Sequence, residues 1–292
     1  MSLADQFPQI TKRDEPLAPH THLKIGGPAE FLMQPRSIEE LQAVLAACQA
    51  QNVPVRMLGG GFNLLVRDDP VPGAVVRLTA SAFTKIEGEG KRIVAGGGGQ
   101  LFDLIAFSVR RGLAGLETLV GSRGTSGGSV RCNVGDRSGE IGQSVQRVTV
   151  LTDANTIQTR NRDELNFTEH QSDIDEPVIL SVEFDLEKDV QPSILKRMLK
   201  AWVMRKASEP FSFQHAARLF RNPPGQQAAT LIDRAGMGKS KIGSAELSDR
   251  NANYVVAHAG TTAADILHLV DHLRDRVKER TGVALDRELH IW

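Results

Sequence analysis

The sequence predicts an α+β protein of more than one domain. Its 292 residues exceed the roughly 100–200 residues of a typical domain. A strand–helix–strand pattern fills about 30 residues near the N-terminus, and strands without intervening helices follow further along the chain. Hydrophobic residues make up 40% and charged residues 24%, which is the composition of a globular chain rather than a disordered one.

Charge and cysteine content exclude several classes of protein. Lys and Arg number 35, as do Asp and Glu, so no basic surplus is available for binding nucleic acid. Two cysteines, Cys48 and Cys132, cannot form a disulfide framework. No apolar run approaches the roughly 18 residues that span a bilayer, and the N-terminus lacks the apolar core of a secretory signal. We therefore expect a cytoplasmic protein with no nucleic-acid or membrane partner.

The first elements follow from local patterns. Residues 1–18 are polar and carry prolines, which predicts an extended leader, and a short strand is expected at 31–33. Ser37 and Glu40 have the spacing of a capping box, which predicts a helix that begins there. The apolar residues of that helix recur at helical spacing and place Cys48 toward the core. A strand at 53–58 completes the strand–helix–strand unit.

Strands and helices are both predicted along the rest of the chain. Strands are predicted at 74–78, 92–95, 145–152 and 178–186, and helices at 101–113 and 191–206. Thr262 and Asp265 form a second capping box, and Gly282 ends the helix that it opens. His268 and His272 lie on the polar face of that helix, so we expect a solvated face rather than a metal site. A strand at 288–291 closes the chain.

Eleven of the 27 glycines fall in three clusters, at residues 59–61, 96–99 and 121–128. The first cluster ends a predicted strand, where glycine lets backbone N–H groups approach a phosphate closely. That loop alone is equally well explained as a tight turn without a ligand. The third cluster alternates glycine with small hydroxyl residues, which suits a pyrophosphate. Two such loops favour a phosphate-binding role over purely structural turns.

Together these motifs resemble the UDP-N-acetylenolpyruvoylglucosamine reductase family. The matching segments run in the family's order from about residue 20 to the C-terminus: residues 24–29, 58–66, 112–117, 121–128, 220–223, 231–236, 248–253 and 285–288. The resemblance implies a two-lobed FAD-binding domain of the vanillyl-alcohol-oxidase type and a C-terminal α+β substrate domain. We expect the FAD-binding region at residues 19–188, with lobes at about 19–80 and 81–188. The substrate domain is expected at 189–292, with its last strand returning towards the flavin.

The resemblance also implies an activity in peptidoglycan synthesis for the cell wall. In this family NADPH reduces a non-covalent FAD, and hydride then passes to the enolpyruvyl group of a UDP sugar to give UDP-N-acetylmuramate. A monomer is expected. The implied FAD-binding residues are Gly59, Gly60, Gly61, Phe62, Asn63, Leu64, Gly121, Gly124, Thr125, Gly127, Gly128, Asn133 and Gly139.

Several positions depart from the family's pattern. Arg218 stands where the family has its acid, a serine, and His170 aligns with an arginine, whereas the glutamate is kept as Glu288. Arg221 and Asn222 match substrate-binding positions. Phe62 replaces a serine that contacts the pyrophosphate. Two further substitutions are Arg123 for a proline and Arg137 for a tyrosine.

These substitutions lead to a hypothesis about catalysis. An arginine side chain stays protonated in proteins, so Arg218 cannot replace serine as the acid. His170 would supply the proton, since imidazole titrates near neutral pH, while Arg218 would hold the substrate carboxylate or the enolate. The alternative is a divergent FAD-binding paralogue that has lost this reaction or acts on another substrate.

Overall fold

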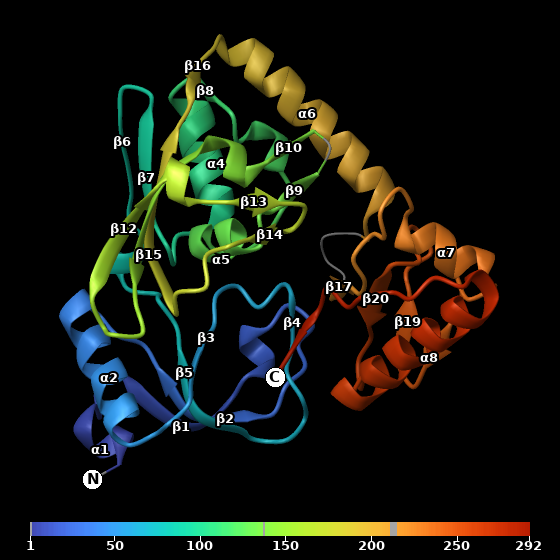
Figure 1. Ribbon diagram of the computed structural model, residues 1–292, viewed down its shortest axis with the longest axis horizontal. Helices are drawn as coiled ribbons and strands as arrows, with labels where there is room; N and C mark the ends of the chain where they lie inside the picture. Colours follow the sequence, from blue (N-terminus) through green and yellow to red (C-terminus); the bar gives the residue numbers. More distant parts are fainter. Residues whose placement is uncertain (1, 137, 211–214) are drawn as a thin grey trace. The chain divides into compact units, whose positions relative to one another are not determined.

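The computed structural model describes residues 2–136, 138–210 and 215–292, and its chain forms two compact units (Figure 1). The first unit comprises residues 1–13, 31–60 and 72–204, and the second comprises 14–30, 61–71 and 205–292. The second unit therefore includes two segments that the sequence had assigned mainly to the FAD-binding region. Backbone hydrogen bonds hold them there, from Gly27 N to Arg67 O at 2.8 Å and from Arg67 N to Trp292 O at 3.0 Å.

The N-terminal residues form a helix as well as a strand, whereas an extended leader was predicted over residues 1–18. Helix α1 spans Leu3–Gln6, with Ser2 as its N-cap, and strand β1 spans Thr11–Pro16. Leu3 and Ile10 are buried at 1% and 7% exposure. Both side chains belong to an apolar core of the first unit, and Ala4 and Phe7 pack against it, which anchors the segment.

One apolar core of the first unit lies between a mixed sheet and helix α2, Ile38–Ala50. The sheet has the order β1–β2–β5–β3, where β2 is Pro28–Met33, β5 is Val71–Val76 and β3 is Val55–Met57. Strands β3 and β5 are parallel. Helix α2 begins as predicted, because Ser37 Oγ accepts a hydrogen bond from Glu40 N. The Glu40 carboxylate, however, accepts from Arg36 N rather than from Ser37 N, so the predicted capping box is only half formed.

The second core of the first unit is built on a five-stranded antiparallel sheet. Its order is β12–β11–β15–β7–β6, with bounds Ile157–Asn161, Val145–Leu151, Val178–Asp185, Arg92–Gly96 and Ile86–Glu89. Helices α4, Leu101–Arg110, and α5, Ser126–Arg131, bury residues in this core, and α5 packs on β15 and β7. This arrangement places the start of α5 beside the end of β7.

Shorter elements complete the first unit. Three two-stranded pairs are β9 Gly135–Asp136 with β10 Gly139–Glu140, β13 Phe167–Thr168 with β14 Gln171–Ser172, and β8 Leu113–Ala114 with β16 Glu187–Lys188. Short helical segments are α3 Ser81–Thr84, η2 Glu117–Leu119, η3 Ile141–Ser144 and η4 Arg162–Glu164. Helix α6, Gln191–Ser208, leads into the second unit.

The second unit packs two helices on an antiparallel sheet. The sheet order is β17–β20–β19–β18, with bounds Ala216–Arg218, Tyr254–Ala257, Ala245–Leu247 and Lys241–Ile242. Helix α8, Ala263–Thr281, lies against β18 and β19, and α7, Ala228–Arg234, lies against α8 (Figure 1). The predicted Thr262 capping box and the left-handed Gly282 at the end of α8 are both confirmed. Strand β21, His290–Ile291, pairs in parallel with β4, Leu64–Leu65, and η1 spans Ala18–His20.

Among the described residues, no helix combines the length and the apolarity needed to cross a bilayer.

The two cysteines should differ sharply in reactivity. Cys48 is 1% exposed in the α2 core, as its spacing predicted, and burial raises the pKa of its thiol to about 11. Cys132 is less buried, at the C-cap of α5. Because the thiolate is the reactive form, iodoacetamide at pH 8 should label Cys132 in the native protein and label Cys48 only after unfolding. Mass spectrometry of the labelled peptides measures this, and early labelling of Cys48 would contradict the buried position.

Candidate functional site

Three glycine-rich segments meet in the first unit. The segment at 96–99 follows β7 and runs beside residues 124–127, with hydrogen bonds from Gly127 N to Gly97 O at 2.9 Å and from Ser126 N to Gly99 O at 2.7 Å. A Cβ added to Gly59, at the end of β3, would lie 2.9 Å from Thr125 Oγ1. The structure therefore gathers around the start of α5 the clusters that the sequence had located separately.

The cluster at 96–99 is required for packing. A Cβ on Gly96, Gly97 or Gly98 would lie 1.9–2.1 Å from a carbonyl oxygen of a neighbouring segment, which no real side chain permits. Gly97 N also donates to Leu180 O at 2.7 Å. These glycines let the backbone pass close to other backbone, which explains their number without any ligand.

The cluster at 121–128 is more open. Gly128 is exposed, although Gly127 and Ser129 on either side are buried. A Cβ on Gly124 would meet only Ser129 Oγ within 4 Å, and one on Gly128 would meet only Thr125 Oγ1, each at 3.3 Å. The buried hydroxyls of Ser122 and Ser129 have no hydrogen-bond partner among the described residues. An open glycine surface with two unpartnered hydroxyls fits the phosphate groups of a dinucleotide.

The predicted FAD residues from Gly61 to Leu64 lie in the second unit. Gly61 has a φ of +64°, and a Cβ there would lie 2.8 Å from His20 O, so glycine is required. The ring of Phe62 packs on the ring of His22 with centroids 4.7 Å apart, and His22 in turn lies 6.1 Å from His215. Phe62 therefore offers an aromatic face where the family has a hydroxyl. Leu64 is buried in β4.

Asn133 and Gly139, also predicted to bind FAD, serve the local fold. Both N–H groups of the Asn133 side chain are used, since Nδ2 donates to Glu140 Oε2 and to Thr168 O, each at 2.8 Å. Its Oδ1 accepts from Gly142 N at 3.0 Å. Gly139 has a φ of +153° in the β9–β10 pair. Any contact of Asn133 with a cofactor would therefore come from its backbone.

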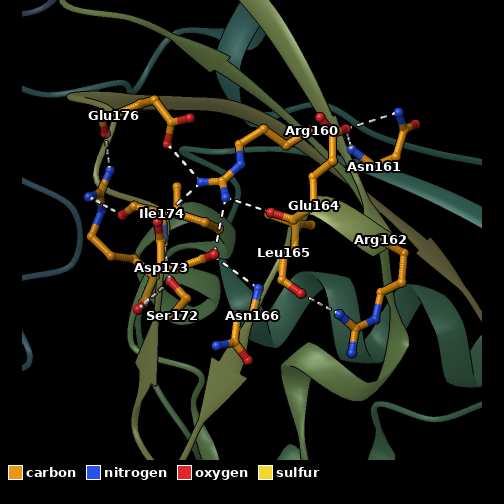
Figure 2. A network of polar contacts seen from close by, with 11 residues as sticks. Arg160, Asn161, Arg162, Glu164, Leu165, Asn166, Ser172, Asp173, Ile174 and Glu176 are labelled. Atoms are coloured by element: carbon orange, nitrogen blue, oxygen red, sulfur yellow. Dashed lines mark hydrogen bonds and ion pairs between the residues drawn. The ribbon is translucent and has the colours of Figure 1, made fainter.

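His170 lies in the turn between β13 and β14, with a φ of +56°. Ser172 Oγ donates to Arg131 O at 2.9 Å, and Asn133 holds Thr168 O, so this hairpin is attached to the end of α5. Beyond the hairpin, Arg160 donates to Asp173 O at 3.1 Å and to Glu164 O at 2.6 Å (Figure 2). The hairpin that carries His170 is thus held by hydrogen bonds on both sides, within the first unit.

Arg218 and Glu288 come together in the second unit. The C-terminal segment runs antiparallel to residues 219–221, with hydrogen bonds from Glu288 N to Leu219 O and from Arg221 N to Asp286 O, both 2.9 Å. This pairing brings Glu288 Oε2 to 3.0 Å from Arg218 Nε, and both side chains are largely buried. The contact has the distance of an ion pair but not the geometry of a hydrogen bond. Of the three predicted catalytic residues, the structure joins these two, whereas His170 belongs to the other unit.

The loop after the glycine triplet is tied to the same segment. Asn63 Nδ2 donates to Glu288 O at 3.2 Å, and His290 N donates to Asn63 O at 3.0 Å. The side chain of one predicted FAD residue therefore fixes the backbone of the predicted catalytic glutamate. These residues are 225 positions apart, and no local pattern in the sequence indicated the bond.

Tyr254 joins this cluster and was not among the predicted site residues. It is the direct cross-strand partner of Arg218 in the β17–β20 pair. The neighbouring pair, Ala217 and Val255, is buried in the core, so Arg218 and Tyr254 share the opposite face of the sheet. The signal available in the sequence was that Tyr254 is the chain's one tyrosine and directly follows the family segment 248–253.

Four further positions singled out in the sequence have different surroundings. Asn222 Oδ1 accepts from Ala228 N at 3.1 Å and so holds the start of α7. Arg221 is exposed, and its backbone is paired with Asp286. Arg123 lies in the open glycine loop. Arg137 falls outside the described residues.

Comparison with protein families finds two matches. Residues 209–292 match the C-terminal domain of UDP-N-acetylenolpyruvoylglucosamine reductase, and residues 29–160 match an FAD-binding domain. The reductase of the same name from Geobacter sulfurreducens is 36% identical over 96% of this chain and 93% of its own length. The one from Latilactobacillus sakei is 34% identical over 96% and 92%.

Solved structures agree with these matches. The crystal structure of UDP-N-acetylenolpyruvylglucosamine reductase (MurB) from Thermus caldophilus is similar with a TM-score of 0.83 and 33% identity, over 97% of this chain and 98% of that one. Physcomitrella patens BBE-like 1 has a TM-score of 0.50 at 13% identity, over 89% of this chain and 83% of its own, which shows a shared fold alone.

Two glycine substitutions should separate packing from cofactor binding. Gly97→Ala puts a Cβ 1.9 Å from Ile179 O. The substitution should therefore lower the free energy of unfolding by about 1–3 kcal/mol or more. Gly128→Ala adds a methyl group on the exposed side of α5, where alanine favours the helix, so the fold should persist. The added methyl should raise the FAD Kd at least about tenfold, or ~1.4 kcal/mol. Thermal unfolding of the flavin-free protein and flavin titration measure the two effects; unchanged FAD affinity in Gly128→Ala would reject the open loop as the phosphate cradle.

Proposed function

This chain belongs to the UDP-N-acetylenolpyruvoylglucosamine reductase family, and we therefore propose that it reduces the enolpyruvyl group of a UDP sugar, with NADPH as the hydride donor and UDP-N-acetylmuramate as the product. One observation of this chain's own geometry carries the proposal. Asn63, in the loop after the glycine triplet, is hydrogen-bonded to the backbone of Glu288, which is paired with Arg218. The proposed cofactor loop is thereby hydrogen-bonded to the backbone of a residue that forms the proposed catalytic ion pair.

FAD would be held mainly by backbone. In the first unit Gly124 and Gly128 offer surface without side chains, and the hydroxyls of Ser122 and Ser129 offer donors to phosphate oxygens. The chemistry supplied by bound FAD is hydride transfer from NADPH to the enolpyruvyl group, so the protein's own residues must bind, orient and provide a proton.

Arg218 is proposed to bind the negative charge of the substrate. A guanidinium group pairs well with a carboxylate or an enolate oxygen because its donors are planar and permanently charged. Glu288 opposite Nε limits the orientation of that group and balances its charge before substrate binds. Arg221 and Asn222 are proposed to contact the nucleotide sugar, with Asn222 also holding the start of α7.

A proton donor is also required, and Arg218 cannot serve as one. His170 is one candidate, because a protonated imidazole can donate a proton from either ring nitrogen. Its hairpin is attached to α5, whose first turn belongs to the proposed FAD cradle.

We also propose that the protein acts as a monomer in the cytoplasm. Residues 1–188 would then provide chiefly FAD binding, and 189–292 substrate binding.

The function is tested by flavin spectra and NADPH oxidation on the purified protein. The purified protein should absorb at about 450 nm, the usual flavin band. NADPH oxidation should depend on added enolpyruvyl UDP sugar and yield the lactyl ether. Bound flavin without that turnover would contradict the proposal and favour the divergent paralogue.

The charge of Arg218 should matter for turnover rather than for flavin binding. Arg218→Met removes the cation that faces Glu288 and the proposed substrate carboxylate, so kcat/KM should fall roughly 10²–10³-fold, or about 2.7–4 kcal/mol, with the flavin spectrum unchanged. Arg276 provides a matched control, because it is an exposed arginine on α8 paired with Glu279 at 2.8 Å. Steady-state kinetics should find Arg276→Met close to wild type; equal effects of the two variants would show that Arg218 has no special role.

A further inference from the structure

We propose that Tyr254 is the proton donor of this reductase, a role that the sequence had assigned to His170; this inference rests on the function proposed above. The β17–β20 pairing sets Tyr254 directly opposite Arg218 on the face of the sheet that turns away from the core. Side chains directly opposite in an antiparallel pair have Cβ atoms about 4.5–5.5 Å apart, so the phenol and the guanidinium are neighbours. Glu288 completes the group at 3.0 Å from Arg218 Nε.

Hydrogen bonds fix the strand register that places Tyr254 opposite Arg218. Ser248 N donates to Tyr254 O at 2.8 Å, and Leu219 N donates to Asn253 O at 2.9 Å. The Asn253 side chain bridges to the next strand in both directions, accepting from Phe220 N at 3.0 Å and donating to Phe220 O at 2.7 Å. Asn253 is 3% exposed, so water does not compete for these bonds. A one-residue slip, which would turn Tyr254 toward the core, is therefore disfavoured.

The surroundings keep the phenol protonated. Burial raises the pKa of Tyr254, and the carboxylates of Glu209 and Glu288 raise it further. The guanidinium groups of Arg218 and Arg205 oppose this shift without overcoming it. A general acid must hold its proton until the base forms, and Tyr254 meets that condition across the physiological range.

Reduction adds a hydride and a proton to the two carbons of the enolpyruvyl double bond. Hydride originating from NADPH adds to the terminal carbon of the enolpyruvyl double bond, and the electron pair of that bond moves to the adjacent carbon, next to the carboxylate. Arg218 stabilises the resulting enolate charge. The adjacent carbon then takes the proton of the Tyr254 hydroxyl, which forms the new C–H bond and leaves a phenolate. The enolate carbon is a much stronger base than a phenolate, so the transfer is downhill, and water later restores the phenol's proton.

The inference explains the pattern of substitution at this site. Arg218 occupies the place where the sequence resemblance puts an acid, and it cannot donate a proton. The residue facing it across the sheet carries a hydroxyl group that can. The acid and the charge-stabilising group are thus both present, in exchanged positions, within one pair of strands.

The kinetic test separates the two half-reactions in the FAD-loaded protein by stopped flow. Tyr254→Phe removes only the hydroxyl, so flavin reduction by NADPH should keep its wild-type rate. Reoxidation by saturating enolpyruvyl UDP sugar should slow about 10²–10⁴-fold, with substrate affinity retained and the solvent deuterium isotope effect altered. Wild-type reoxidation in Tyr254→Phe would overturn the inference, as would loss of the limiting rate in His170→Ala alone. Absence of substrate-dependent reoxidation in the wild type would instead refute the proposed function.

A spectroscopic test needs no turnover. Because the chain has one tyrosine, protein labelled with ¹³C at the hydroxyl-bearing ring carbon gives one tyrosine signal, whose shift reports ionisation of Tyr254. The signal should titrate above the ordinary tyrosine range. The titration should move to higher pH in Arg218→Met and to lower pH in Glu288→Gln, because these variants remove an opposing and a reinforcing charge. An ordinary titration that neither variant changes would place Tyr254 outside the cluster and overturn the inference.

Discussion

The second unit depends on how the last seven residues of the chain satisfy their backbone hydrogen bonds. Residues 286–288 pair with 219–221, and residues 290–292 then pair with the segment at 63–67, ending with Arg67 N donating to Trp292 O. Buried backbone groups must be paired, so this segment joins two parts of the chain that are far apart in sequence. The same pairing carries Glu288 to Arg218 and fixes it through Asn63. Fold and proposed catalytic centre therefore rest on one set of bonds.

The glycine clusters, which look alike in the sequence, have two physical roles. At 96–98 the missing Cβ allows close passage of backbone past Phe83, Ile179 and Leu78. At 124 and 128 the missing Cβ leaves open surface beside two unpartnered serine hydroxyls. The first role stabilises the core on which α5 rests, and for the second we propose that the start of α5 receives a phosphate. A cofactor cradle made of backbone is precise only because the packing glycines hold it in place.

The substitutions at chemical positions are easier to understand in the folded protein. In the sequence alone, Arg218 in place of an acid leaves two hypotheses open: His170 supplies the proton instead, or the protein has lost this reaction or acts on another substrate. In the structure Arg218 lies beside the carboxylate of Glu288 and is the cross-strand partner of Tyr254, so the three groups that we propose for catalysis are gathered beside β17. Phe62 likewise exchanges a hydroxyl for a ring stacked on His22, beside the glycine triplet.

The sequence by itself determined the features that arise within one or two turns of chain. The start of α2 at Ser37, the capping box and glycine stop of α8, and the burial of Cys48 followed from nearest neighbours, and the ordered motifs identified the family. Only the tertiary structure decided that residues 14–30 and 61–71 join the C-terminal unit, which glycines are packing residues, and that Tyr254 faces Arg218. The physical reason is the distance along the chain over which each effect acts. Caps and periodicity act within a few residues, whereas strand register and backbone approach depend on segments as much as 225 residues apart, whose pairing leaves no local signature.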